Sequence, residues 1–388
     1  MVNDLVFNQM STVLNAITKQ VTGAEPIAIV DTASFISVGQ TVLKQGYDPL
    51  NTAISQIYSH TIFSTRKYTG KMKGIKVDSR KFGAIARKLA MVDSEWDDES
   101  SYELVNDQSV DMYKVKKPSV LQLNFYGANV FKRFYTVYLN QLDCALDGPE
   151  QLANFTAMYM TNVSDMIEQC EETTARMIIA NFIGGKIAAN NGVVHLVSEY
   201  NDYAGTDLDT DTVRQPQNWE GFAKFAAARI KDISNLMTER TRLFQIQVDG
   251  KPLTRHTPKN KQKFYMFSPY MNYTLTSVYS SIFGPDYLKT IDYEEVNFWQ
   301  SVDSPDGISV KPIYLDTNGS LKTTEEAITQ ANIYGVIFDE EALGYTIVNE
   351  WAATTPLNAD GGYYNHYYHY THRYWNDFTE KGVVLLLD

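Results

Sequence analysis

The stretch that decides the fold is residues 149–189, which read PEQLANFTAMYMTNVSDMIEQCEETTARMIIANFIGGKIAA. Pro149 suits the first position of a helix, and Glu150 places a negative charge in the first turn. One stripe then recurs at helical spacing, formed by Leu152, Phe155, Tyr159, Val163, Met166, Cys170, Thr173, Met177 and Asn181. Roughly 35 residues at about 1.5 Å each span roughly 50 Å, too long for the core of one compact domain. We therefore predict a spine helix, closed or kinked by Gly184-Gly185.

The region before this helix, residues 60–130, carries two charge runs of opposite sign. Nine basic residues and one acid lie in Arg66–Lys88, and eight acids with no base lie in Leu89–Tyr113. Strand-like segments flank these charges at Thr61–Tyr68 and Ser119–Tyr126. We interpret the region as a long two-stranded excursion. A lone two-stranded ribbon is marginal in water, so it is expected to lie on something else, such as a neighbouring subunit. The alternative is a solvated hairpin whose charges screen each other.

The first 59 residues predict a partly helical arm. Residues 4–21 carry a helical stripe that Thr22-Gly23 ends, and the rest of the arm has breaks at Gly39, Gly46 and Asp48-Pro49.

Beyond the spine helix, the pattern predicts a mixed layer of helices and strands. The predicted strands are Val193–Glu199, Lys263–Phe267 and Asn332–Phe338, and the predicted helices are Trp219–Leu243 and Tyr270–Ile282. The tail 363–378 holds eight aromatic residues in sixteen and leads to an apolar strand beginning at Gly382. Two strands around Asn376–Gly382 predict a terminal hairpin.

Motifs for catalysis or ion binding are incomplete. Gly184-Gly185-Lys186 lacks the first glycine and the following Ser or Thr of a phosphate-binding loop. Asp207, Asp209 and Asp211 match the first three ligands of a calcium loop, but Thr212 and Asn218 replace its required Gly and Glu. We interpret these acids as a solvated loop.

Three histidines in the tail raise the question of a metal site. Because strand side chains alternate, His366 and His372 would share one face and His369 would lie on the other. They could not converge on one ion, so the sequence predicts no metal, cofactor or catalytic residue. Cys144 and Cys170 suit small-hydrophobe packing in a reducing compartment.

Composition narrows the class further. The chain has 388 residues, a net charge of −12 and 26 Tyr, with 44% apolar residues. The acidic balance argues against a duplex DNA binder. No apolar run is long enough for a membrane span, and the N-terminus has no basic segment of a secretory signal. Abundant Tyr with no catalytic motif favours an assembling protein over a compact enzyme.

Two stretches carry a resemblance to a known family. Residues 333–344, Ile-Tyr-Gly-Val-Ile-Phe-Asp-Glu-Glu-Ala-Leu-Gly, resemble the strand and "Asp-x-x-Ala-Leu-Gly" segment of the apical domain in major capsid proteins of tailed bacteriophages. The closing residues 365–386 resemble the aromatic strand and "Gly-Val-Val" strand that end these proteins. With the order of elements, they make the chain similar to the Hong Kong 97-type capsid fold, an α+β class.

The resemblance implies a division of the chain. We expect an N-terminal arm at 1–59 and an extended loop at 60–130. A peripheral domain at 131–215 would contain the spine helix 149–189, and an apical domain would cover 216–360. Terminal strands at 361–388 would return to the peripheral domain.

The resemblance also implies a function. Members build icosahedral heads from hexamers and pentamers that enclose double-stranded DNA, with the extended loop lying over the adjacent subunit. The loop residues expected to make intersubunit contacts here are Lys71, Lys73, Lys76, Arg80, Lys81, Asp93, Glu95, Asp97, Asp98 and Glu99. The loop lysines also offer donors for the subunit cross-linking of some members, although none matches the cross-linking position.

Expected partners are other copies of the chain, a separate scaffolding protein, a portal protein at one vertex and possible decoration proteins. A separate scaffold is expected because the 59-residue arm is short for a fused one. DNA contact would be weak and non-specific, no membrane would be involved, and assembly would occur in the host bacterial cytoplasm before the protein resides in the virion. The alternatives are an encapsulin-type nanocompartment shell, an enzyme with dispersed carboxylates, or a glycan-binding protein with an exposed Tyr-rich tail.

Overall fold

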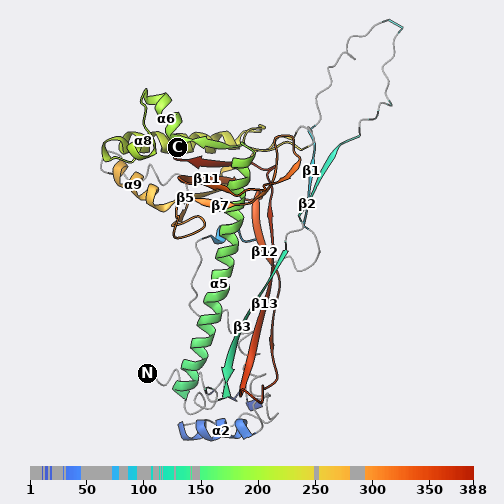
Figure 1. The fold of residues 1–388 in the computed structure, drawn as a ribbon. Coiled ribbons are helices and arrows are strands. Elements are labelled where there is room, and N and C mark those ends of the chain that lie inside the picture. The colour runs from blue at the N-terminus through green and yellow to red at the C-terminus, as the bar shows by residue number, and fades with distance from the viewer. Residues whose placement is uncertain are drawn as a thin grey trace.

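A computed structural model describes residues 32–44, 72–77, 86–93, 117–125, 128–139, 149–248, 253–279 and 293–388, with isolated residues elsewhere in the first 141. A wide head stands on a long stalk, and the C-terminus lies in the head (Figure 1). Helix α2 (Thr32–Lys44) lies at the far end of the stalk. Of the helical stripe predicted in 4–21, only single residues such as Leu14 and Thr18 are described, and these are helical.

The predicted spine helix is confirmed as α5 (Pro149–Ala188), which runs up the stalk into the head (Figure 1). Its final turns are buried in the head core, where Phe182 stacks on Phe378 at 5.4 Å between ring centroids. The prediction that Gly184-Gly185 closes the helix is wrong. A Cβ on Gly184 would lie 2.5 Å from Val310, and one on Gly185 would lie 2.4 Å from Phe378. These glycines let other elements pack closely against a continuing helix.

The head is built on a five-stranded sheet. Its order is β4 (Val193–His195), β14 (Gly382–Leu386), β11 (Ile333–Asp339), β5 (Gln262–Phe267) and β6 (Glu294–Val296). The central strand β11 runs antiparallel to both neighbours, and every residue of β11 and β14 is buried. Such continuous apolar strands fit a sheet covered on both faces. The predicted strands 263–267 and 332–338 are therefore confirmed as β5 and β11.

Helices cover this sheet. They are α6 (Leu196–Ala204), α7 (Thr210–Val213), α8 (Pro216–Thr238) and α9 (Ser268–Tyr279). The predicted helices at 219–243 and 270–282 correspond to α8 and α9. The predicted strand 193–199 is right only as far as His195, because Leu196 and Val197 fill the core from the first turn of α6. Short elements complete the head: η1 (Lys73–Ile75), η3 (Lys259–Lys261), β7 (Ile308–Val310) with β10 (Ile328–Gln330), and β8 (Ile313–Leu315) with β9 (Leu321–Thr323).

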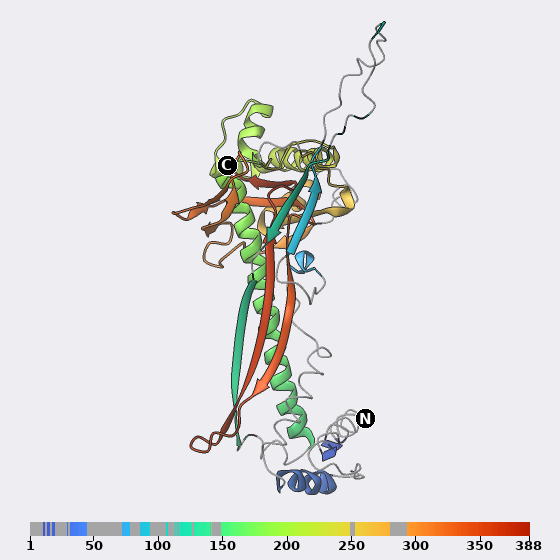
Figure 2. The same ribbon diagram turned by 90° about the vertical axis from the view of Figure 1, so that its right-hand side faces the viewer.

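The stalk pairs α5 with a three-stranded antiparallel sheet. β13 (Tyr363–Asn376) lies between β12 (Leu343–Thr354) and β3 (Ala128–Tyr138). Figure 2 shows this sheet face on, with α5 behind it. Tyr368 is buried against Val163 of the helix, so alternate residues of β13 face α5 and the others face away.

The predicted terminal hairpin around Asn376–Gly382 is wrong, because β13 and β14 lie in different sheets. The turn between them carries the chain from the stalk sheet into the centre of the head sheet. The sheets also cross the boundaries expected at 215 and 360. β4 precedes 216 but lies in the head sheet, β12 precedes 361 but lies in the stalk sheet, and β14 does not return to the stalk. Sheet partners are set by long-range pairing, which a boundary drawn along the chain does not reflect.

A two-stranded ribbon, β1 (Ala86–Met91) with β2 (Val120–Phe125), leaves the head near its junction with the stalk (Figure 1). It confirms a strand at 119–126, paired in register from Ala86↔Phe125 to Met91↔Val120. The strand expected at Thr61–Tyr68 lies outside the described residues. Among the helices in the described part of the chain, none is both long and apolar enough to cross a membrane.

Candidate functional site

The structure describes three of the ten residues expected at intersubunit contacts. These are Lys76, Asp93 and, for its backbone, Lys73. The others lie outside the described residues: Lys71, Arg80, Lys81, Glu95, Asp97, Asp98 and Glu99.

Lys76 contacts its own chain. Its Nζ lies 2.8 Å from Glu171 Oε2 on α5, and the Glu171 side chain is 5% exposed. The Tyr345 hydroxyl donates to the same carboxylate at 3.3 Å, and the backbones of Lys76 and Tyr345 form an isolated β-bridge. This ion pair therefore fastens the segment after η1 to the spine helix and β12.

Asp93 also contacts its own chain at the end of β1. It accepts hydrogen bonds from the Thr254 backbone N–H at 2.7 Å and from the Thr254 hydroxyl, and it pairs with Arg240. The Thr254 hydroxyl bond, with the nearby Arg240 guanidinium, holds the pKa of Asp93 below its ordinary value. The first acid of the acidic run thus fixes the ribbon to the segment that follows α8.

Lys88 is a second anchor of the ribbon, with three carboxylate partners, and the sequence pattern did not single it out. Its Nζ lies 3.2 Å from Glu341, 3.1 Å from Asp377 and 2.5 Å from Glu380. Burial works to lower the pKa of Lys88, but Asp377 and Glu380 outweigh it and raise that pKa above its ordinary value. Strand alternation offered a signal, because Lys88 falls on the same face as buried Ala90.

The turn at 377–381 that meets Lys88 is itself tied to the head, and a second buried lysine lies at the end of α5. Thr379 donates to Asp377 through its N–H at 2.9 Å and its hydroxyl at 2.6 Å. The fully buried Lys381 donates to the Glu239 carbonyl at 2.7 Å, and the fully buried Lys186 donates to the Phe244 carbonyl at 2.7 Å. Burial lowers the pKa of Lys186 to about 7. Lys186 therefore holds a structural hydrogen bond where the sequence showed an incomplete phosphate loop.

The face of the ribbon turned away from the head is exposed. Its apolar side chains gather at the end near Met91, and the rest of the face carries the polar Arg87, Gln122 and Asn124. Leu89 and Met91 are each 67% exposed, and Val120 opposite Met91 is 53% exposed. The other face is covered, since Ala90 and Leu121 pack with Leu253. Apolar side chains gathered on one side of a protruding ribbon mark an interaction surface.

The stalk sheet presents a second exposed aromatic face, on the side away from α5. Phe134 stacks on Tyr367 at 5.5 Å, and Trp351 stacks on His369 at 4.0 Å. Phe134 is 57% exposed and Trp351 is 51% exposed. Within the described chain, this face has no covering element, as Figure 2 shows.

The tail histidines lie as their alternation predicts. His366 and His372 are buried on the side of β13 toward α5, while His369 lies on the outer side against Trp351. His372 Nδ1 lies 3.4 Å from Thr174 on α5, and His366 Nδ1 lies 2.9 Å from Thr354. Burial lowers the pKa of His366 to about 4. In the described ranges, no group of three His, Cys, Asp or Glu side chains is placed to hold a metal.

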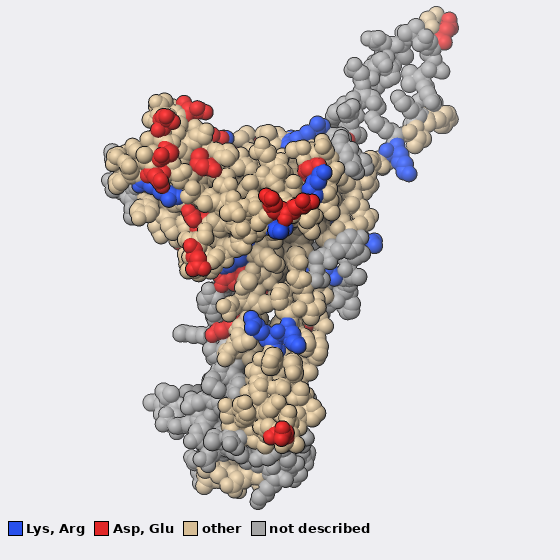
Figure 3. All heavy atoms as spheres, in the orientation of Figure 1, with Lys and Arg blue, Asp and Glu red and all other residues tan. Residues whose placement is uncertain are grey.

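The acids of residues 207–211 are solvated, as predicted, but they do not all lie in a loop, because Asp209 caps the short helix α7 and Asp211 lies within it. Asp209 accepts from the N–H groups of Asp211 and Thr212 at the start of α7, and the three acids are exposed. Figure 3 shows acidic side chains gathered over this end of the head, around α6.

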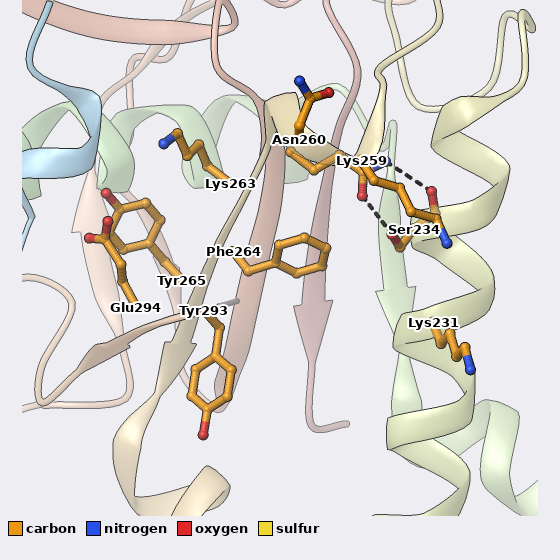
Figure 4. Close-up of a pocket in the computed structure, with 10 residues that line it drawn as sticks. Lys231, Ser234, Lys259, Asn260, Lys263, Phe264, Tyr265, Tyr293 and Glu294 are labelled. Carbon is orange, nitrogen blue, oxygen red and sulfur yellow. Dashed lines mark hydrogen bonds between the residues drawn. The ribbon is translucent and has the colours of Figure 1, made fainter. Parts of the chain in front are cut away.

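The head also carries a lysine-rimmed groove of about 460 Å³ between α8 and β6. Its lining comes from Lys231 and Ser234 of α8, Lys259 and Asn260 of η3, Gln262, Lys263, Phe264 and Tyr265 of β5, and Tyr293 and Glu294. In Figure 4, Phe264 lies between Lys263 on one side and Lys231 and Lys259 on the other.

Comparison with known proteins points to one family. Residues 14–385 match the family described as Phi29-like phage major capsid protein. A search of curated proteins found no match. Among solved structures, chains in the capsid structure of Staphylococcus phage Andhra and in the structure of the head fibre and inner core protein gp22 of native bacteriophage P68 are similar. Each has a TM-score of 0.53 and 11% identity, covering 84% of this chain and 86% of its own. At that identity the likeness shows the fold alone.

Proposed function

Because the chain belongs to the family of Phi29-like phage major capsid proteins, we propose that its ribbon lies over an adjacent subunit in an icosahedral head. The chain is a structural subunit of the phage head and resides in the virion, where its copies assemble into the shell. Its fold is the Hong Kong 97 type, an α+β class.

The exposed apolar end of this ribbon face carries the proposal. Leu89, Met91 and Val120 project from a protruding two-stranded element whose other face is anchored in the head. If copies are related head to tail, each copy would cover this part of the ribbon of its neighbour. When the rotation from one copy to the next closes on itself, the copies form a ring. Hexamers and pentamers are the rings we propose for this shell, enclosing the double-stranded DNA genome.

We further propose that the head of the molecule serves as the apical domain and the stalk as the peripheral domain. The expected contact residues in the acidic run, including Glu95, Asp97, Asp98 and Glu99, would then lie near a neighbour. Lys76 and Asp93 instead have partners within the chain, so their proposed role is to hold the ribbon in place.

The proposed partners follow the family resemblance. They are a separate scaffolding protein, a portal protein at one vertex and possible decoration proteins, with weak non-specific contact to packaged DNA. Assembly would occur in the cytoplasm of the bacterial host. We propose no catalytic, cofactor or metal role for the chain.

The ribbon face can be tested by replacing Leu89, Met91 and Val120 with Ser together. Since these side chains are exposed, the unassembled subunit should keep its thermal midpoint within about 2 °C, because surface changes cost little. Shell yield by sucrose-gradient sedimentation should fall at least tenfold. The control replaces exposed Leu236 and Leu243 of the head with Ser, which should leave the yield within twofold. Wild-type yield from the ribbon variant would contradict the proposal.

A further inference from the structure

The lysine-rimmed groove has a charge that the rest of the chain does not explain. Lys259 and Lys263 line it, and within the described residues neither makes an ion pair. Lys231, which has an interaction of its own, lines the α8 side of the groove (Figure 4). On a chain with a net charge of −12, the two lysines that have no ion pair in the described residues favour an anionic occupant of the groove.

The floor of the groove is aromatic rather than charged. Phe264, which is 6% exposed, lies between the lysines, and Tyr293 lines the groove next to β6 (Figure 4). Its volume of about 460 Å³ lies within the roughly 300–1,000 Å³ typical of ligand pockets. A bare inorganic anion would leave this aromatic surface unused, so the fitting occupant combines carboxylates with an aromatic or apolar side chain.

One segment of the chain has that combination. Residues 94–104 read SEWDDESSYEL, with Trp96 and Tyr102 set among Glu95, Asp97, Asp98, Glu99 and Glu103 and no basic residue. Exposed ion pairs contribute little binding free energy by themselves. The lysines would therefore select an acidic segment, and burial of an aromatic side chain of that segment in the groove would supply most of the binding free energy.

We propose that this groove binds the acidic segment 94–104 of a second copy of the chain. The inference rests on the proposed function, since it requires copies to lie side by side in a shell. It assigns the acidic arm of the extended loop a receptor on the neighbour's head: Trp96 on the aromatic floor, and the flanking carboxylates on Lys259 and Lys263.

One group in the groove opposes an acidic occupant. Glu294 lines the end where it lies beside Tyr265 (Figure 4). Burial, with the neighbouring Glu294 carboxylate, raises the pKa of Tyr265, which keeps that phenol neutral. The proposal therefore places the carboxylates of the segment toward η3 and α8 and away from Glu294.

A charge-reversal experiment tests the pairing. Lys259→Glu with Lys263→Glu should lower shell yield at least tenfold, with circular dichroism and thermal midpoint of the unassembled subunit unchanged. Asp97→Lys, Asp98→Lys and Glu99→Lys together should give a similar loss. Combining both sets should restore the yield to within threefold of wild type. Lys224→Glu with Lys311→Glu, which makes the same net-charge change at exposed sites of the head, should stay within twofold.

Cross-linking identifies the source of the segment. With Cys144 and Cys170 replaced by Ser, Asp97→Cys and Lys259→Cys should react with a short bismaleimide to give multi-chain species on denaturing gels. A cross-link confined to single chains would show that the chain's own loop fills the groove, and would overturn the proposal.

Other outcomes also decide the question. Suppose that the wild-type chain forms shells and that the Lys259 and Lys263 variant gives the same yield. This result would overturn the groove proposal and leave the shell function intact. The same yield with reduced DNA content would assign the groove to packaged DNA, which overturns it as well. Absence of shells from the wild-type chain, both alone and co-expressed with its scaffolding candidate, would overturn both proposals.

Discussion

Lys88 Nζ lies 3.1 Å from Asp377 Oδ2, so the first strand of the ribbon is ion-paired to the turn that leads from the stalk sheet into the head sheet. Glu380 from the same turn and Glu341 from the turn before β12 complete the contact. The direction in which the ribbon leaves the head is therefore fixed where head and stalk meet.

Lys88→Met should destabilise the unassembled subunit by about 3 kcal/mol, because it leaves the buried carboxylates of Asp377 and Glu380 with one fewer cation. Urea unfolding followed by tryptophan fluorescence measures the change. Lys224→Met, which breaks an exposed pair with Glu220, should cost less than about 1 kcal/mol. Equal effects of the two substitutions would show that Lys88 is not an anchor.

A double-mutant cycle separates the two roles considered for Lys76. If it fastens its own chain, Lys76→Gln and Glu171→Gln should each lower the unfolding free energy of the unassembled subunit by about 1–2 kcal/mol. Their coupling should be about 0.5 kcal/mol or more, since the residues are in contact. Unchanged stability of the subunit with loss of shell yield would instead place Lys76 at an intersubunit contact.

Acid should loosen the stalk through His366. Burial lowers its pKa to about 4, below the value of about 6.5 in an unfolded chain. The unfolded state therefore binds more protons between pH 6.5 and 4, and folding stability falls as the pH drops through that range, by up to about 3 kcal/mol. Urea unfolding at pH 7.5 and 4.5 measures the loss.

His366→Gln should shrink this acid loss, whereas His369→Gln on the outer side of the same strand should leave it at the wild-type value. An unaltered acid response in the His366 variant would assign the loss to other groups.

Two glycines with left-handed backbones give a matched pair. Gly192 has φ of +73°, and a Cβ there would lie 2.4 Å from the Gly382 carbonyl oxygen. Gly205 has φ of +66° and open space around it. Gly205→Ala should cost about 1 kcal/mol for the backbone alone, and Gly192→Ala should cost at least about 2 kcal/mol more. Differential scanning calorimetry compares them, and equal costs would contradict the close packing of Gly192 on β14.

Local patterns predicted the elements better than their partners. The stripe from Leu152 to Asn181 located α5, and the apolar run ending at Phe338 located β11, because helical and buried-strand periods are properties of a short segment. The same reasoning joined Asn376 and Gly382 in a hairpin. It failed because Asp377–Lys381 is a turn between sheets, and the strand that a given strand pairs with depends on residues far along the chain.

The candidate contact surfaces show the same limit. Charge counting located the ribbon, but it did not separate Lys76 and Asp93, which have partners in their own chain, from the acids beyond Asp93. Lys88 was visible only as one base among nine, since its carboxylate partners lie about 250 residues or more along the sequence. The lysine-rimmed groove draws on α8, η3 and β5, and no single stretch of sequence displays it.

The central claim is that this chain is an assembling shell subunit, and electron microscopy with light scattering tests it most directly. The chain should be purified alone and after co-expression with its scaffolding candidate. We predict uniform closed shells or capsomer rings of five and six subunits. A stable, monodisperse monomer in both preparations would contradict the account.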